Sequence, residues 1–95
     1  MKFSGENTDI EQEVVSLEDL IGTYNIVLYN DDVNTFDWVI ESLIELCDHS
    51  PEQAEQCALL VHYKGKCNVK SGSYNELRPI CEALLDRGLS VKLED

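Results

Sequence analysis

The chain has 95 residues, 43% of them hydrophobic, which suits one small domain because a chain of this length can close only a single core. Its 19 acidic and 7 basic residues give a formal net charge of −12, which would repel nucleic-acid phosphates and anionic lipid surfaces. No stretch approaches the roughly 18 consecutive apolar residues of a membrane span, and the amino terminus shows no signal sequence. We therefore expect a cytoplasmic protein that has neither nucleic acid nor membrane as a partner.

The four cysteines are spaced for neither a zinc site nor a redox pair. Cys47, Cys57, Cys67 and Cys81 form no CxxC motif, and no histidine stands at zinc-finger spacing from them. Cys47, Cys57 and Cys81 fall on apolar helical stripes, where a thiol behaves as a small hydrophobic group. None lies in a glycine-rich or electropositive helix start that would activate it as a nucleophile. We expect buried reduced thiols, no metal, no cofactor and no enzymatic activity.

The first part of the chain differs in composition from the rest. Residues 1–22 carry six acidic residues and one lysine with few apolar positions, and we expect a flexible acidic extension there. The segment TYNIVLY that follows is rich in β-branched and aromatic residues, which predicts a buried strand. The folded domain is therefore expected to span residues 23–95.

An amphipathic helix is predicted after this strand. Apolar residues recur at helical spacing from Phe36 to Cys47, while acidic residues occupy the opposite face. The side-chain oxygen of Asn34 or Thr35 is expected to cap the amino-terminal end of the helix. His49, beyond the carboxyl end, is expected to face solvent.

Two further helices are predicted from their capping residues. Ser50, followed by a proline at the first helical position, begins a helix that runs toward Gly65. Ser73, with a glutamate three residues later, begins a helix that stops at Gly88. Short strands are predicted near residues 66–70 and over residues 89–94. The order β-α-α-β-α-β predicts an α+β domain in which a three-stranded antiparallel sheet packs against three helices.

The polar run Asn30-Asp31-Asp32 lies where the first strand gives way to the first helix. Such a loop is well placed for binding because regular structure holds both of its ends. The same residues are also typical of a simple turn, since their side chains bond nearby backbone amides. His62, in the last turn of the second helix, equally fits a structural histidine whose charge complements the helix dipole.

The segment YNIVLYNDDVNTFDWV, followed by LLVHYKG, resembles the ClpS family of Clp protease adaptors from Tyr24 through the last strand. The resemblance implies a protein that binds substrates by a free amino-terminal Leu, Phe, Tyr or Trp. It also implies delivery of these substrates to a Clp AAA+ unfoldase of the ClpA or ClpC type in the N-degron pathway. The amino-terminal extension would help this handover.

The resemblance also assigns roles to particular residues. Asn30, Asp31 and His62 would hold the α-ammonium group of the substrate, because an ammonium has three donors and seeks three acceptors. The pocket for the substrate side chain would consist of Asp32, Asn34, Phe36, Val39, Ala58, Val61 and Leu89. Lys64, Lys66 and Arg78 would contribute to the surface that faces the unfoldase.

The chain departs from the family pattern at two places in the pocket. Asn34-Thr35-Phe36 stands where the family commonly has Thr-Pro-Met, and Ala58 stands where a methionine is frequent. We expect Ala58 to widen the pocket toward β-branched side chains and the bulky Phe36 to narrow its rim.

A different class of function remains open on the same fold. An interaction module would bind a protein face, as the carboxy-terminal domain of the ribosomal stalk protein does, and would have no pocket for a terminus. Blocking the α-amine of a peptide distinguishes these two functions, since only the first depends on that group.

Overall fold

The computed structural model describes residues 23–95, and the acidic extension expected over residues 1–22 lies outside this range. The elements in chain order are β1 (Tyr24–Tyr29), α3 (Phe36–Cys47), α4 (Pro51–Lys64), β2 (Lys66–Gly72), α5 (Tyr74–Asp86) and β3 (Val91–Glu94). This order confirms the predicted α+β fold with three helices and three strands.

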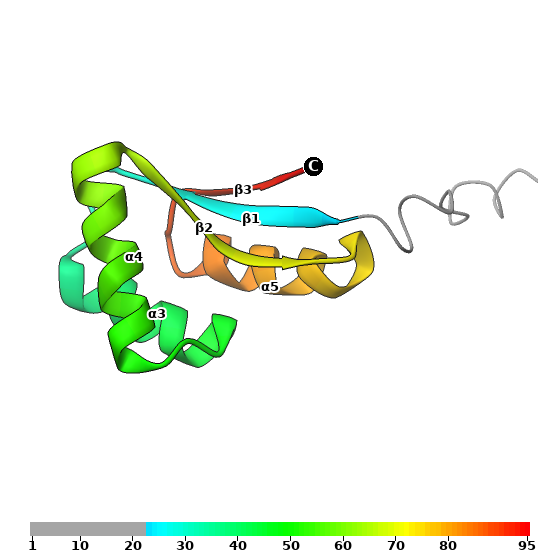
Figure 1. Ribbon diagram of the computed structural model, residues 1–95, viewed down its shortest axis with the longest axis horizontal. Helices are drawn as coiled ribbons and strands as arrows, with labels where there is room; N and C mark the ends of the chain where they lie inside the picture. The colour runs from blue at the N-terminus through cyan, green and yellow to red at the C-terminus, as the bar shows by residue number, and fades with distance from the viewer. Residues whose placement is uncertain (1–22) are drawn as a thin grey trace, which may run out of the picture.

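The first strand occupies the centre of the sheet. The strand order is β2-β1-β3, and both neighbours run antiparallel to β1. Helix α5 runs along one face of the sheet, whereas α3 and α4 form a pair at the end where β1 leads into α3 (Figure 1). Ile26 and Leu28 point to the same face of β1 and are 0% and 2% exposed, so this face of the central strand carries the core, while Val27 between them is 8% exposed.

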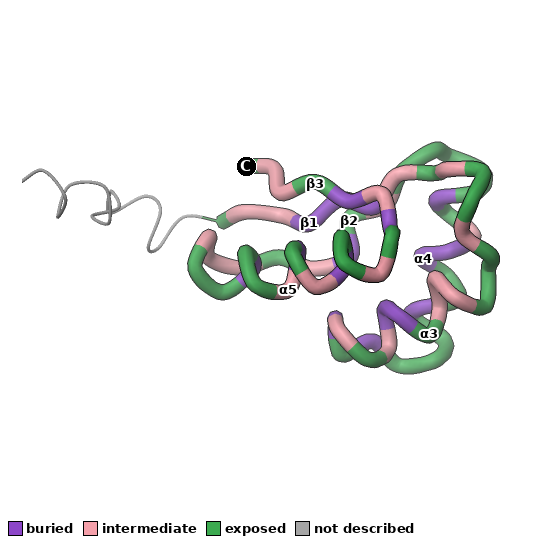
Figure 2. Tube along the Cα trace, turned by 180° about the vertical axis from the view of Figure 1, so that it is seen from behind, coloured by how far each residue is buried: buried purple, intermediate pink, exposed green. Residues whose placement is uncertain are grey.

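All elements contribute apolar side chains to one core. Buried positions lie on the inner sides of α3 and α4 and in the middle of the sheet (Figure 2). The largest fully buried apolar side chains are Ile26, Leu28, Leu43, Leu77 and Leu84. Cys47, Cys57 and Cys81 are buried free cysteines, which confirms that they pack as part of helical stripes.

The helix ends follow the predicted capping chemistry. Thr35 rather than Asn34 caps α3, since its Oγ1 accepts from the Trp38 backbone amide at 3.1 Å. Ser73 and Glu76 form a complete capping box at the start of α5. Helix α4 ends at Gly65, whose φ of 94° is readily adopted only by glycine.

Three local expectations need correction. His49 is 6% exposed, because the left-handed backbone of Asp48 turns the chain inward and His49 Nε2 bonds the Val69 carbonyl oxygen at 2.7 Å. Strand β2 extends through Gly72, where a turn was expected, because Gly72 pairs with β1. The last strand begins at Val91 instead of residue 89, since the amide of Leu89 donates to a helix carbonyl and completes the end of α5.

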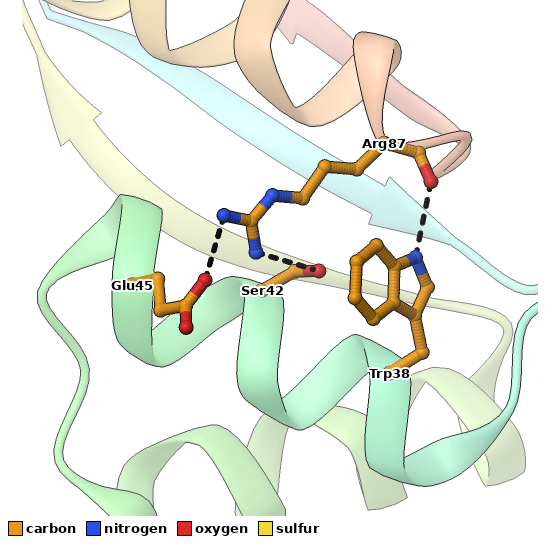
Figure 3. A network of polar contacts seen from close by, with 4 residues as sticks. All are labelled: Trp38, Ser42, Glu45 and Arg87. Carbon is orange, nitrogen blue, oxygen red and sulfur yellow. Dashed lines mark hydrogen bonds and ion pairs between the residues drawn. The ribbon is translucent and has the colours of Figure 1, made fainter.

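Arg87 bonds the turn between α5 and β3 to helix α3 (Figure 3). Its guanidinium group pairs with Glu45 at 2.6 Å, donates to Ser42 at 3.4 Å and lies 5.4 Å from the ring centroid of Trp38. The indole Nε1 of Trp38 donates to the Arg87 carbonyl oxygen at 3.0 Å. The turn that leads into β3 therefore has a fixed position relative to the start of α3.

Candidate functional site

A pocket opens where the end of β1, the start of α3 and the last turns of α4 meet. Its volume is about 100 Å³. An apolar cavity of about 150 Å³ holds benzene, so this pocket has the scale of one amino-acid side chain. The residues that line it are Leu28, Tyr29, Asn30, Asp31, Asn34, Thr35, Phe36, Val39, Ala58, Val61 and His62.

Apolar side chains form one part of the pocket wall. Ala58 and Val61 lie on one face of α4, because residues three apart in a helix are neighbours, and they are 3% and 7% exposed. Leu28 from β1 is also buried, and Val39 contributes from α3. Phe36 is 40% exposed and stands at the edge of the pocket rather than at its bottom.

Backbone hydrogen bonding brings Asn30 beside the end of α4. The amide of Asn30 donates to the Gly65 carbonyl oxygen at 3.0 Å, immediately beyond the helix that carries His62. The His62 ring is exposed and has the rings of Phe36 and Tyr63 edge-on, with centroids at 6.0 and 4.9 Å. Two polar side chains from distant parts of the sequence thus share the mouth of the pocket.

The carboxylate of Asp31 is held by four hydrogen bonds. Oδ1 accepts from the backbone amides of Val33 and Asn34, both at 2.9 Å. Oδ2 accepts from Asn34 Nδ2 at 2.8 Å and from Ser90 Oγ at 2.7 Å. Burial alone would raise the pKa of Asp31, but these hydrogen bonds favour the charged form and lower the pKa to about 2. Asp31 is therefore an ionised and fixed acceptor.

The low pKa of Asp31 predicts a particular pH dependence of stability. The folded-state pKa of Asp31 is about 2, below its ordinary value of 3.8, so the ionised carboxylate stabilises the fold at pH values above 3.8. This stabilisation is lost as the pH falls through the folded-state pKa. We expect Asp31→Asn to lower the free energy of unfolding by a constant amount at neutral pH. This difference should shrink as the pH falls from about 4 toward about 2. Urea titrations of both chains at successive pH values measure it, and a difference that stays constant throughout would contradict the hydrogen-bonded carboxylate.

The structure brings most of the predicted site residues to one pocket. Asn30, Asp31, Asn34, Phe36, Val39, Ala58, Val61 and His62 all line it. Asp32 is exposed beside the pocket, and Leu89, 3% exposed, lies in the core. Lys64 and Lys66 are exposed next to the end of α4, whereas Arg78 pairs with Glu82 on α5 at 3.1 Å.

Sequence reasoning missed several members of this site. Leu28 and Tyr29 also line the pocket, and their place immediately before the polar loop was the available signal. Ser90 contacts Asp31 from 59 positions further along the chain. No local sequence pattern predicts that contact, because it depends on how β3 lies against β1.

Burial disfavours the thiolate form of three cysteines in the helices. Burial raises the pKa of Cys47 to about 11, and burial with the neighbouring Cys67 raises the pKa of Cys57 to about 12. Burial also raises the pKa of Cys81. Within residues 23–95, no cluster of three or more His, Cys, Asp or Glu side chains is placed to hold a metal ion. No helix in this part of the chain has the length and apolar character needed to cross a membrane.

Comparison with protein families assigns this chain to a class of protease adaptors. The family model of the ATP-dependent Clp protease adaptor protein ClpS matches residues 21–92. The chain therefore belongs to the ClpS family, as its sequence motifs predicted.

Individual relatives agree with this assignment. The ClpS adapter of Pectobacterium carotovorum subsp. carotovorum (strain PC1) is 39% identical over 59 residues, which cover 60% of this chain and 56% of that protein. The ClpS adapter of Campylobacter jejuni subsp. jejuni (strain 81-176) is 43% identical over 42 residues, 44% of each chain. The chain thus aligns with about half the length of these curated relatives.

A solved structure shares the fold at low sequence identity. ClpS2 of Agrobacterium tumefaciens, bound to L-phenylalaninamide, superposes with a TM-score of 0.65 at 18% identity. The match covers 76% of this chain and 94% of that protein. The predicted three-stranded fold is therefore confirmed by a family relative.

Proposed function

We propose that this chain binds the free amino-terminal residue of another polypeptide and delivers that polypeptide to a Clp AAA+ unfoldase. The observation that carries this proposal is the pocket, in which polar and apolar side chains together line a cavity with the volume of one side chain. Membership of a family of Clp protease adaptors supports the delivery step. The Agrobacterium fold relative holds L-phenylalaninamide, which has a free α-amine and one aromatic side chain and is thus a ligand of the proposed class.

The polar mouth suits an α-ammonium group. An ammonium has three N–H donors, and the mouth offers the amide oxygen of Asn30, a ring nitrogen of His62 and the charge of Asp31. An internal peptide nitrogen has a single hydrogen and no charge. The proposed site therefore distinguishes a chain terminus from the interior of a chain.

The apolar cavity sets the class of amino-terminal residue. Val39, Ala58 and Val61 provide no hydrogen-bonding side-chain groups, so the cavity favours Leu, Phe, Tyr or Trp over polar residues. The small Ala58 leaves room at the bottom, where a β-branched side chain would need it, while Phe36 restricts the rim. Asp32 adds negative charge beside the mouth and is exposed, which favours the approach of a cationic terminus.

The partner in delivery is a Clp unfoldase of the ClpA or ClpC type, which places the proposed activity in the cytoplasm. Lys64 and Lys66 are exposed beside the pocket and carry positive charge in a chain whose net charge is −12, so they are candidates for contact with an acidic unfoldase surface. The adaptor itself would perform no chemistry, and the raised thiol pKa values of Cys47 and Cys57 support this view.

The proposal predicts that peptide binding depends on a free α-amine. A fluorescein-labelled peptide that begins with free Leu should bind about 30-fold more tightly than its amino-acetylated twin, because acetylation removes the charge and two of the three donors. Fluorescence-anisotropy titration of the full chain with both peptides measures the ratio. A peptide that begins with Ser provides the control for the apolar cavity.

Equal binding of the free and acetylated peptides would overturn recognition of the terminus. In that case the interaction module on the same fold, which binds a protein face, would become the better account. Binding that requires the free amine but is equal for Leu and Ser would leave the ammonium site intact and overturn the side-chain pocket.

A further inference from the structure

The acidic loop between β1 and α3 is held by hydrogen bonds rather than by packing. Asn30 and Asp32 are exposed, and Val33 is 84% exposed, so no apolar side chain of this segment is buried. A loop without buried side chains has little packing energy to fix its conformation. Its position therefore depends on the polar contacts that join it to the rest of the domain.

Those contacts fall into a local set and a distant set. The two backbone amides that donate to Asp31 Oδ1 belong to Val33 and Asn34, so they shape the loop internally. The two donors to Oδ2 connect the loop to a distant segment. Ser90 immediately precedes β3, and Asn34 Nδ2 also donates to the Gly88 carbonyl oxygen at 2.9 Å. Only the distant set ties the loop to the turn between α5 and β3.

That turn is itself a rigid support. The Arg87 guanidinium pairs with Glu45 of helix α3, and the indole of Trp38 donates to the Arg87 carbonyl oxygen, so this turn is bound to α3 at two points (Figure 3). The Ser90 carbonyl oxygen accepts from the amide of Tyr29 at 2.7 Å, which ties the same turn to the end of β1. Ser90 thus holds the Asp31 carboxylate from a position fixed on two sides.

The charge of the two side-chain donors affects what the Asp31 carboxylate can bind. Ser90 and Asn34 are neutral, and no salt bridge to Asp31 occurs within residues 23–95. A lysine or arginine partner would hold the carboxylate as firmly but would cancel its charge. Neutral donors orient the carboxylate and leave its negative charge available to a cationic ligand.

We propose that Ser90 and the side chain of Asn34 are positioning residues for the amino-terminus site, which hold the Asp31 carboxylate and the adjoining Asn30 toward the ammonium of the ligand. This inference rests on the proposed function and adds to it the residues that set amine selectivity. It assigns Asn34 to the support of Asp31 instead of to contact with the substrate side chain.

The test compares Ser90→Ala with Ser71→Ala. Ser71 also donates its hydroxyl to a side-chain oxygen, that of Asn25 at 2.6 Å, but it lies in β2 and does not line the pocket, so it is a matched control. Titration with the Leu-initiated peptide should show about fivefold weaker binding of the free-amine form by Ser90→Ala. Binding of the acetylated form should stay within about twofold, and Ser71→Ala should change neither.

A double-mutant cycle separates positioning from a general structural role. If Ser90 acts through Asp31, Ser90→Ala should add less than about twofold in an Asp31→Asn background. Ser90→Thr retains the hydroxyl, so it should keep the amine selectivity that Ser90→Ala loses. Asn34→Ala removes the other donor to Asp31 Oδ2 and is an independent second variant. Loss of selectivity in Asn34→Ala supports the inference even where Ser90→Ala proves too unstable to measure.

The outcomes distinguish the inference from the function on which it rests. Wild-type binding that ignores acetylation would overturn the proposed function. Wild-type binding that requires the amine, with Ser90→Ala and Asn34→Ala both equal to Ser71→Ala, would overturn only the positioning role. Equal losses for the free and acetylated peptides would also overturn it, because they would report a general loss of structure.

Discussion

The Asp31→Asn variant should bind a Leu-initiated peptide about 100-fold more weakly than the wild-type chain, a loss of about 2.7 kcal/mol. Two effects combine in this change. The negative charge that would face the ammonium in the proposed site disappears, and the new Nδ2 group cannot accept the hydrogen bond that Asn34 Nδ2 donates at 2.8 Å. Fluorescence anisotropy measures the affinity, and urea denaturation should show a parallel loss of stability of about 1 to 3 kcal/mol.

Two matched variants separate charge from geometry in this experiment. Asp32→Asn removes the same charge from the same loop, but Asp32 is exposed, so the free energy of unfolding should change by less than about 0.5 kcal/mol. Glu52→Gln removes one charge at the first turn of α4, the opposite end of the helix from His62, and should leave the affinity unchanged. An affinity of Asp31→Asn within about twofold of wild type would contradict a role for this carboxylate in binding.

The Leu43→Ala variant should lower the free energy of unfolding by about 3 to 5 kcal/mol, since it leaves a cavity at a position that is 0% exposed. Total stabilities of small domains are about 5 to 15 kcal/mol, so this is a large share. Leu43 lies on the buried face of α3, and the first turns of the same helix carry Phe36 and Val39 of the pocket. Urea denaturation followed by fluorescence of the single tryptophan measures the effect, because Trp38 bonds to Arg87 only in the folded chain.

Leu60→Ala provides the matched control for this cavity. The chemical change is the same, but Leu60 is 45% exposed on α4 and should cost less than about 1 kcal/mol. Similar losses of unfolding free energy in Leu43→Ala and Leu60→Ala would contradict a dominant contribution of the buried core around Leu43 to the stability of the domain.

The helices and the order of elements follow from local patterns. The apolar spacing from Phe36 to Cys47 predicts an amphipathic helix, and that segment is α3. Ser50 and Ser73 begin helices because a capping side chain satisfies amides within the next turn, an interaction that spans only three residues. Such contacts are readable in the sequence because both partners lie within one turn of each other.

The ends of strands were less predictable, because their partners lie far apart in the chain. Gly72 belongs to β2 only because it pairs with Tyr24, and Leu89 caps α5 instead of entering β3. His49 is buried because a left-handed residue turns the chain and the Val69 carbonyl oxygen offers a partner. These outcomes depend on the register of the sheet and on how the helices pack against it.

The sequence by itself determined the fold class, the membership of the ClpS family and the identity of most residues that line the pocket. The fold class follows from periodicity and capping, whereas the family and the pocket residues follow from the resemblance that two contiguous motifs carry. Only the tertiary structure decided which acceptors are already engaged. Asp31 has both oxygens hydrogen-bonded, and one donor, Ser90, comes from 59 positions away. A contact of that kind exists only when β3 pairs with β1, because the pairing brings the two segments within hydrogen-bonding distance.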